Sequence, residues 1–110
     1  MRQIVIDELT PLERDNLDSY LKRTLIQGFL SGTFWLKIPE SLLSTLQLDH
    51  RKCQPFWVTA LLDKQTLTIE LLVRSSTNLH CPCTAYATVS QRDFIFEFVD
   101  TMLAEEHITA

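Results

Sequence analysis

The chain has 110 residues, of which 45% are hydrophobic and 22% charged, a composition typical of one globular domain, which we expect to span residues 1–110. Fourteen acidic and ten dispersed basic residues give a net charge of −4, so we expect no nucleic-acid surface. No apolar run approaches the roughly eighteen residues of a membrane helix, and the first residues do not resemble a signal peptide. We therefore predict a cytoplasmic protein without membrane contact.

The amino-terminal part of the chain predicts a strand and a helix. Residues 3–6 are an apolar run that favours an edge strand or a docked arm. Thr10-Pro11-Leu12-Glu13 then supplies a capping hydroxyl, a proline at the first helical position and a glutamate three residues after the cap. An apolar residue recurs at every fourth position, and we expect the helix to continue to Gly28 or Gly32. These apolar positions are Leu17, Leu21, Leu25 and Phe29.

The middle of the chain predicts strands. Residues 33–38 alternate apolar and polar side chains until Pro39, and residues 40–46 favour a short helix. Residues 56–62 and 66–73 indicate an antiparallel hairpin, because the second of them alternates strictly. Residues 84–88 favour one further strand. The side chains of the second hairpin strand that we expect to face the helices are Leu67, Ile69, Leu71 and Val73.

The carboxy-terminal part predicts a last helix, which we expect to open at Ser90-Gln91-Arg92-Asp93. Its expected buried stripe is Phe94, Ile95, Phe98, Val99, Met102 and Leu103. The predicted order is therefore β-α-β-(short α)-β-β-β-α. Short connections between neighbouring strands favour antiparallel pairing. We predict an α+β fold, in which an amino-terminal and a carboxy-terminal helix pack on a small antiparallel sheet of about four to five strands.

All three cysteines and two of the three histidines fall in two clusters, His50-Arg51-Lys52-Cys53 and His80-Cys81-Pro82-Cys83. Thiolate and imidazole are the ligands that zinc prefers in proteins. The predicted hairpin returns the chain to its starting point, so we expect the two clusters to lie close together. We predict a closed, structural zinc site of the Cys₃His type. Its expected ligands are His50, Cys53, Cys81 and Cys83, with His80 as a substitute for His50.

Other interpretations of these cysteines stay open. Buried thiols are commonly small core residues, and the Cys-Pro-Cys spacing is narrower than that of the usual zinc motifs. Two close thiols are also suited to redox chemistry. Cys53 and His50 resemble a nucleophile and its base, but no acid is placed to orient the histidine. In a reducing cytosol we expect thiols that are free, metal-bound or redox-active, and no structural disulfide.

The remaining motifs favour a binding role. Two glycines cannot make a phosphate-binding loop, and the chain has no Gly-x-Ser-x-Gly or His-Glu-x-x-His motif. Trp35 and Trp57 fall on the strand faces opposite the apolar stripes, where they pack under a helix or form an exposed patch. We expect a non-catalytic module that binds a protein partner, or itself, through Trp35 and Trp57. The alternative is a thiol redox or metal-handling protein that uses the Cys-Pro-Cys pair.

Overall fold

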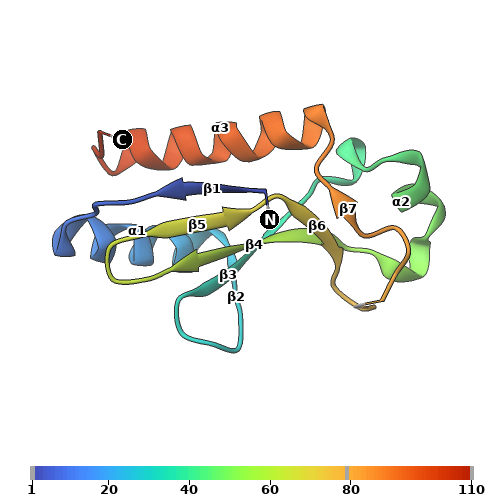
Figure 1. Ribbon diagram of the computed structural model, residues 1–110, viewed down its shortest axis with the longest axis horizontal. Coiled ribbons are helices and arrows are strands. Elements are labelled where there is room, and N and C mark those ends of the chain that lie inside the picture. The colour runs from blue at the N-terminus through green and yellow to red at the C-terminus, as the bar shows by residue number, and fades with distance from the viewer. Residues whose placement is uncertain (1, 79, 110) are drawn as a thin grey trace.

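The computed structural model describes residues 2–78 and 80–109 as an antiparallel sheet with α-helices (Figure 1). Its elements are β1 (Gln3–Ile6), α1 (Pro11–Thr24), β2 (Ile26–Gln27), β3 (Thr33–Lys37), α2 (Thr45–Asp49), β4 (Phe56–Leu62), β5 (Leu67–Glu70), β6 (Leu72–Ser75), β7 (Ala85–Tyr86) and α3 (Val89–Glu105). Two 3₁₀ helices, η1 (Glu40–Leu42) and η2 (Arg51–Cys53), flank α2. The α+β class is confirmed, but among the described residues the sheet has seven strands where four to five were predicted, and the predicted order of elements is only partly matched because β2 and the division into β5 and β6 were not expected.

The strands follow the order β1-β5-β4-β3-β2, and β6 pairs with both β4 and β7. The predicted hairpin is confirmed, although its second strand is divided into β5 and β6. Ala60 pairs with Ile69 and Trp57 pairs with Arg74. Residues 70–73 therefore lie opposite only two residues of β4, 58 and 59. Because the register shifts by an even number of residues, the alternation of faces is preserved. The four side chains expected to face inward are all buried: Leu67, Ile69, Leu71 and Val73.

Each α-helix begins with the same reciprocal arrangement of two hydrogen bonds. At α1 the Thr10 hydroxyl accepts from the Glu13 N–H, and the Glu13 carboxylate accepts from the Thr10 N–H. Ser44 and Gln47 do the same at α2, and Thr88 and Gln91 at α3. The predicted start of the last helix at Ser90 was therefore two residues late. A glutamine at the third helical position serves as well as a glutamate, because its amide oxygen also accepts a hydrogen bond.

Helix α1 ends at Thr24, so the prediction that it continues to Gly28 or Gly32 was wrong. The next residues form β2 instead, in which Ile26 pairs with Trp35. The Gly28 N–H donates to the Thr33 carbonyl over 2.8 Å and helps to close the β2–β3 turn. These pairings satisfy backbone groups that a longer helix would have used, and they leave Phe29 99% exposed in the turn.

Gly32 is the residue on which this turn depends. Its φ of +81° is unfavourable for residues with a side chain, and a Cβ atom would overlap the Leu62 carbonyl oxygen. We expect Gly32→Ala to lower the free energy of unfolding by about 2 kcal/mol. Gly28→Ala is the matched control, because its Cβ would meet the Thr33 side chain rather than backbone. Urea denaturation of both variants measures the difference, and equal losses would contradict the assignment.

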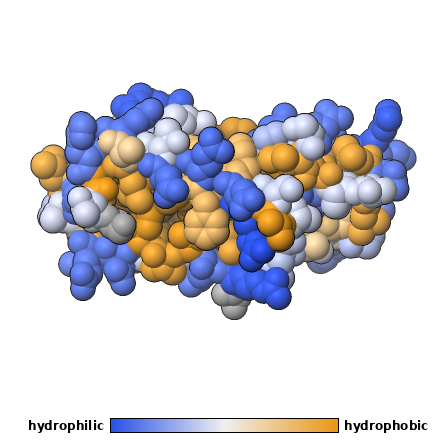
Figure 2. Space-filling view, turned by 90° about the horizontal axis from the view of Figure 1, so that it is seen from above, coloured by the Kyte–Doolittle hydropathy of each residue, from blue (hydrophilic) through white to orange (hydrophobic). Residues whose placement is uncertain are grey.

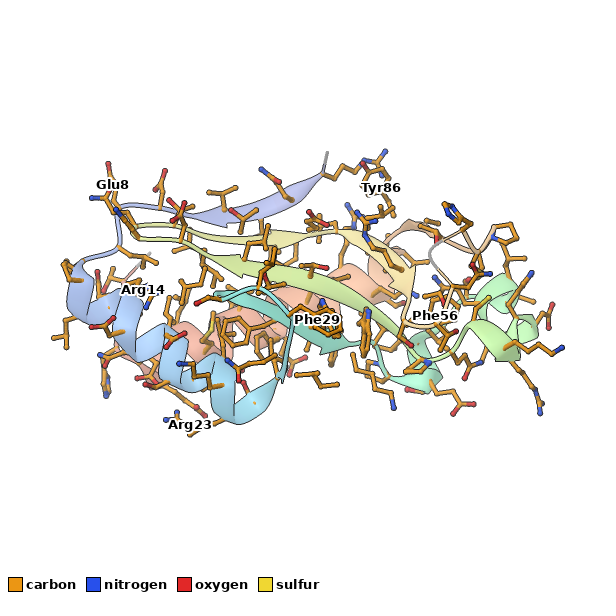
Figure 3. All side chains as sticks on the ribbon, turned by 90° about the horizontal axis from the view of Figure 1, so that it is seen from below. Glu8, Arg14, Arg23, Phe29, Phe56 and Tyr86 are labelled. Atoms are coloured by element: carbon orange, nitrogen blue, oxygen red, sulfur yellow. A yellow bond between two sulfur atoms is a disulfide. The ribbon has the colours of Figure 1, made fainter. Side chains whose placement is uncertain are left out.

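The sheet has one covered and one open face. Helix α3 lies across the covered face, and α1 packs beside it, with the rings of Tyr20 and Phe98 6.1 Å apart. Seen from the α3 side, apolar surface lies among hydrophilic side chains (Figure 2). The largest fully buried side chains include Phe34, Phe56, Leu67, Ile95 and Met102. Figure 3 views the opposite face, where no helix of the described residues lies over the sheet.

Candidate functional site

Two loops at one end of the sheet position the cysteines. Cys53 is the last residue of η2, three residues before the first residue of β4, and Cys81 and Cys83 lie in the loop between β6 and β7. Phe56 at the start of β4 pairs with Ser75 at the end of β6. Because these strands are antiparallel, the chain leaving β6 runs beside the chain entering β4. The hairpin therefore brings the two sequence clusters to the same place.

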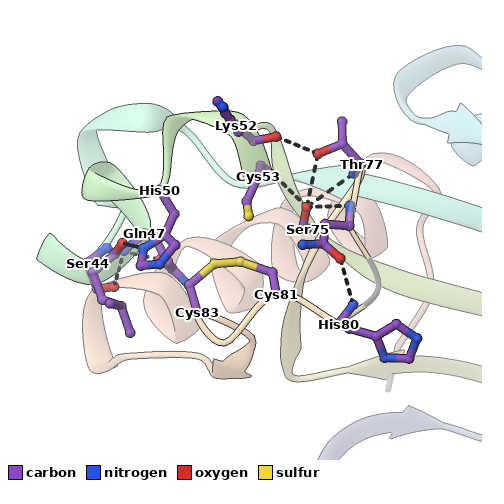
Figure 4. The surroundings of a disulfide bond; sticks show 12 residues. Ser44, Gln47, His50, Lys52, Cys53, Ser75, Thr77, His80, Cys81 and Cys83 are labelled. Atoms are coloured by element: carbon purple, nitrogen blue, oxygen red, sulfur yellow. Dashed lines mark hydrogen bonds between the residues drawn. A yellow bond between two sulfur atoms is a disulfide. The ribbon is translucent and has the colours of Figure 1, made fainter.

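The buried hydroxyl of Ser75 joins the two loops (Figure 4). It donates to the Cys53 carbonyl over 2.6 Å and accepts from the N–H groups of Thr77 and Asn78. The Thr77 hydroxyl donates to the Lys52 carbonyl over 2.8 Å. Sequence reasoning missed this role of Ser75, since a serine at a strand end carries no signal of a partner 22 residues away.

The three cysteine sulfurs lie within 4.8 Å of one another. All three residues are buried, with exposed fractions of 6% for Cys53, 3% for Cys81 and 1% for Cys83. Cys81 and Cys83 are joined by a disulfide, whereas Cys53 is a free thiol. This differs from the expectation of three unbridged thiols. The Thr84 N–H donates to the Cys81 carbonyl, so the loop forms a tight turn that holds the two Cα atoms 5.3 Å apart, within disulfide reach.

Neither His50 nor His80 places a ring nitrogen within 4.8 Å of all three cysteine sulfurs. The His50 Nδ1 lies 2.7 Å from the Leu46 carbonyl oxygen. A carbonyl only accepts, so Nδ1 carries a proton, and it is Nε2 that holds the lone pair when the imidazole is neutral. The backbone N–H of His80 donates to the Asn78 side chain, and the His80 ring points away from the disulfide in Figure 4. The structure thus assembles the three cysteines without either predicted histidine.

The open face of the sheet carries the tryptophans, stacked with ring centroids 4.6 Å apart. The ring of Phe29 meets Trp35 edge-on at 6.3 Å. We call these three residues, Phe29, Trp35 and Trp57, the aromatic face. Beside it Arg74 and Glu70 form an ion pair at 3.4 Å. An open hollow of about 570 Å³ lies among these side chains. Sequence reasoning did not identify Phe29, because its position in an apolar periodicity placed it in a helix.

Comparison with protein families, curated proteins and solved structures finds no match to this chain. None of the helices in the described ranges combines the length and the apolar character needed to cross a membrane. The cysteine cluster can hold a soft metal ion once its disulfide is reduced, and the aromatic face can bury apolar area against another surface.

Proposed function

We propose that this protein is a non-catalytic interaction module that pairs with a second copy of itself through the aromatic face. One observation carries the proposal: a fully exposed Phe29 stands on the same face as an open hollow lined by Trp57, Thr59 and Leu61. Two copies related by a two-fold axis present the same patch to each other. Each Phe29 would then find an apolar hollow in the other copy, which is the arrangement of an interface anchor.

The charges of the chain favour this face for self-association. The whole chain carries a net charge of −4, so two copies repel each other over most orientations. Around the aromatic face the charged residues are Lys37, Glu70 and Arg74, which sum to +1 at neutral pH. The other charges of the chain sum to −5, so this face lacks the negative charge that opposes association elsewhere. The Glu70–Arg74 pair also offers both signs, as a self-complementary surface requires.

The test is the oligomeric state of Phe29→Ser. We expect the wild-type protein to dimerise with rising concentration and Phe29→Ser to raise the dimer dissociation constant by at least about ten-fold. Sedimentation equilibrium measures both constants. Leu12→Ser on α1 is the matched control, because Leu12 is also strongly exposed but does not line the hollow at the aromatic face. A wild-type protein that stays monomeric at millimolar concentration, or equal weakening by both variants, would overturn the proposal.

A second proposal concerns the cysteine cluster, which we infer to be a structural zinc site in its reduced form. A tetrahedral zinc with sulfurs at about 2.3 Å separates those sulfurs by roughly 3.8 Å. The three sulfurs already lie within 4.8 Å of one another, so small movements suffice. Two electrons and two protons from a dithiol reductant would open the Cys81–Cys83 bond, and zinc would then displace the thiol protons. This form belongs in a reducing compartment such as the cytoplasm.

The fourth ligand in this proposal is His50, which lies outside the present group of three cysteines and would have to move toward it on zinc binding. Its Nδ1–H donates to a backbone carbonyl, the arrangement that orients a histidine to bind metal through Nε2. A thiol redox role is the alternative, since a disulfide with a neighbouring thiol is suited to exchange. Burial of all three cysteines favours the structural role, because a redox partner must reach a sulfur atom. The zinc response of the reduced protein separates the two roles.

A further inference from the structure

A groove lies between strand β1 and helix α3, on the covered side of the sheet and away from the aromatic face. Its volume is about 480 Å³. The apolar residues that line it are Ile4, Val5, Ile6, Phe96, Val99 and Leu103. Val5 and Phe96 are each 47% exposed, so the groove has apolar walls that remain in contact with solvent. Contiguous exposed apolar surface of this kind marks interaction sites.

One wall of the groove is a sheet edge with unused backbone groups. Strand β1 lies at the end of the sheet, and within residues 2–78 and 80–109 its one partner is β5. The Leu71 N–H donates to the Arg2 carbonyl, and hydrogen-bonded pairs alternate along an antiparallel ladder. Ile4 and Ile6 therefore share the ladder with β5. The N–H and C=O groups of Gln3 and Val5 point to the free edge, where a further strand can pair with them.

The charges at this groove are of one sign. Asp7, Glu8 and Asp100 line it, and no basic residue does so among the described residues. The two faces of the molecule thus differ, since the aromatic face has an excess of positive charge. Carboxylates around an apolar groove attract a cationic partner and repel an acidic one. A second copy of this chain, with its net charge of −4, is poorly suited to this site.

We propose that the groove binds an extended, basic segment of another protein, which adds to the sheet beside β1. Main-chain hydrogen bonds to Gln3 and Val5 would supply affinity, as in other recognition by strand addition. Apolar side chains of the segment would pack against α3, and its Lys or Arg side chains would reach the three carboxylates. β1 has four residues. At roughly 3.3 Å per residue, a segment of about six residues spans this edge and extends about one residue beyond each end.

The experiment uses a fluorescent peptide of about nine residues in which valine and lysine alternate. We expect the full chain to bind this peptide, as measured by fluorescence anisotropy. The dissociation constant should rise at least about ten-fold between low and high salt. A peptide with glutamate in place of lysine should not bind. N-methylation of alternate peptide bonds blocks edge pairing without changing charge, and we expect it to weaken binding by more than about ten-fold.

Variants of the protein locate the site. Asp100→Lys should weaken binding of the lysine peptide by about ten-fold. Glu97→Lys is the matched control, because it makes the same change on α3 outside the groove and should alter binding by less than about two-fold. Val5→Pro removes an N–H that points to the free edge, and an edge strand tolerates proline at such a position. We expect this variant to lose peptide binding. Circular dichroism verifies that each variant folds.

Several results would overturn the proposal. Equal binding of the N-methylated peptide would exclude strand addition, and equal weakening by Asp100→Lys and Glu97→Lys would exclude this groove. Absence of binding at millimolar peptide would exclude this groove as a peptide site. Self-association lost in Val5→Pro but retained in Phe29→Ser would assign the edge to a second copy instead. Peptide binding is also measured on Phe29→Ser. Because this variant is weakened in dimerisation through the aromatic face, its peptide binding reports on the groove alone.

Discussion

Adding zinc to the fully reduced protein should raise its melting temperature by about 10–20 °C. A ligand that binds only the folded state at about 1,000 times its Kd stabilises that state by about 4 kcal/mol, and each kcal/mol shifts the melting temperature of a chain this size by about 4 °C. The disulfide cannot produce such a change. It joins residues two apart in sequence, so it removes little freedom from the unfolded chain and contributes about 1–2 kcal/mol.

Cys53→Ser is the control for this prediction. This variant lacks the third sulfur but can still form the Cys81–Cys83 disulfide. In its reduced form we expect zinc to leave the melting temperature unchanged. In its oxidised form it should melt as the oxidised wild-type protein does. His50→Gln should weaken zinc binding by at least about ten-fold. Calorimetric melts with and without a chelator measure these shifts. If reduced wild-type protein takes up no zinc and its melting temperature does not move, the zinc proposal fails and thiol exchange becomes the better account.

Replacing Gln91 by leucine should lower the free energy of unfolding by about 3 kcal/mol. Gln91 is 0% exposed, and its amide oxygen accepts from the Thr88 N–H at the start of α3. Its Nε2 donates to the Leu42 carbonyl over 3.0 Å and to the Gln47 amide oxygen over 2.9 Å. Leucine fills similar volume but removes the partners of the Leu42 carbonyl and the Thr88 N–H. It leaves the Gln47 amide oxygen with only the hydrogen bond from the Ser44 N–H, and the loss of hydrogen bonds around a fully buried side chain is the costly part.

Glu13→Leu is the matched control for Gln91→Leu. Glu13 occupies the same position of the capping arrangement in α1, but its hydrogen bond is exposed and its partner can turn to water. We expect a loss of about 0.5–1 kcal/mol for Glu13→Leu. Chemical denaturation of both variants gives the comparison. Losses of the same size would show that Gln91 acts only as a helix cap and not as the link between α3 and α2.

Local sequence signals were sufficient where the stabilising interactions are themselves local. The Thr10–Glu13 cap lies within four residues, and the alternation of β5 and β6 follows from a backbone that turns successive side chains to opposite faces. The meeting of Cys53 with Cys81 and Cys83 was also predictable, because antiparallel pairing returns a hairpin to its origin. These inferences require only the period of the side chains and the direction of the strands.

Tertiary structure decided what depends on partners distant in sequence. The residues from Leu25 to Phe29 suit a helix by their spacing, yet pairing of β2 with β3 draws them into a turn and exposes Phe29. The disulfide depends on how the β6–β7 loop closes, and the Ser75 and Gln91 side chains find their partners 22 and 49 residues away. A sequence pattern records the face on which a side chain lies. The partner it meets there depends on how the loops close and the layers pack, which involves the whole chain.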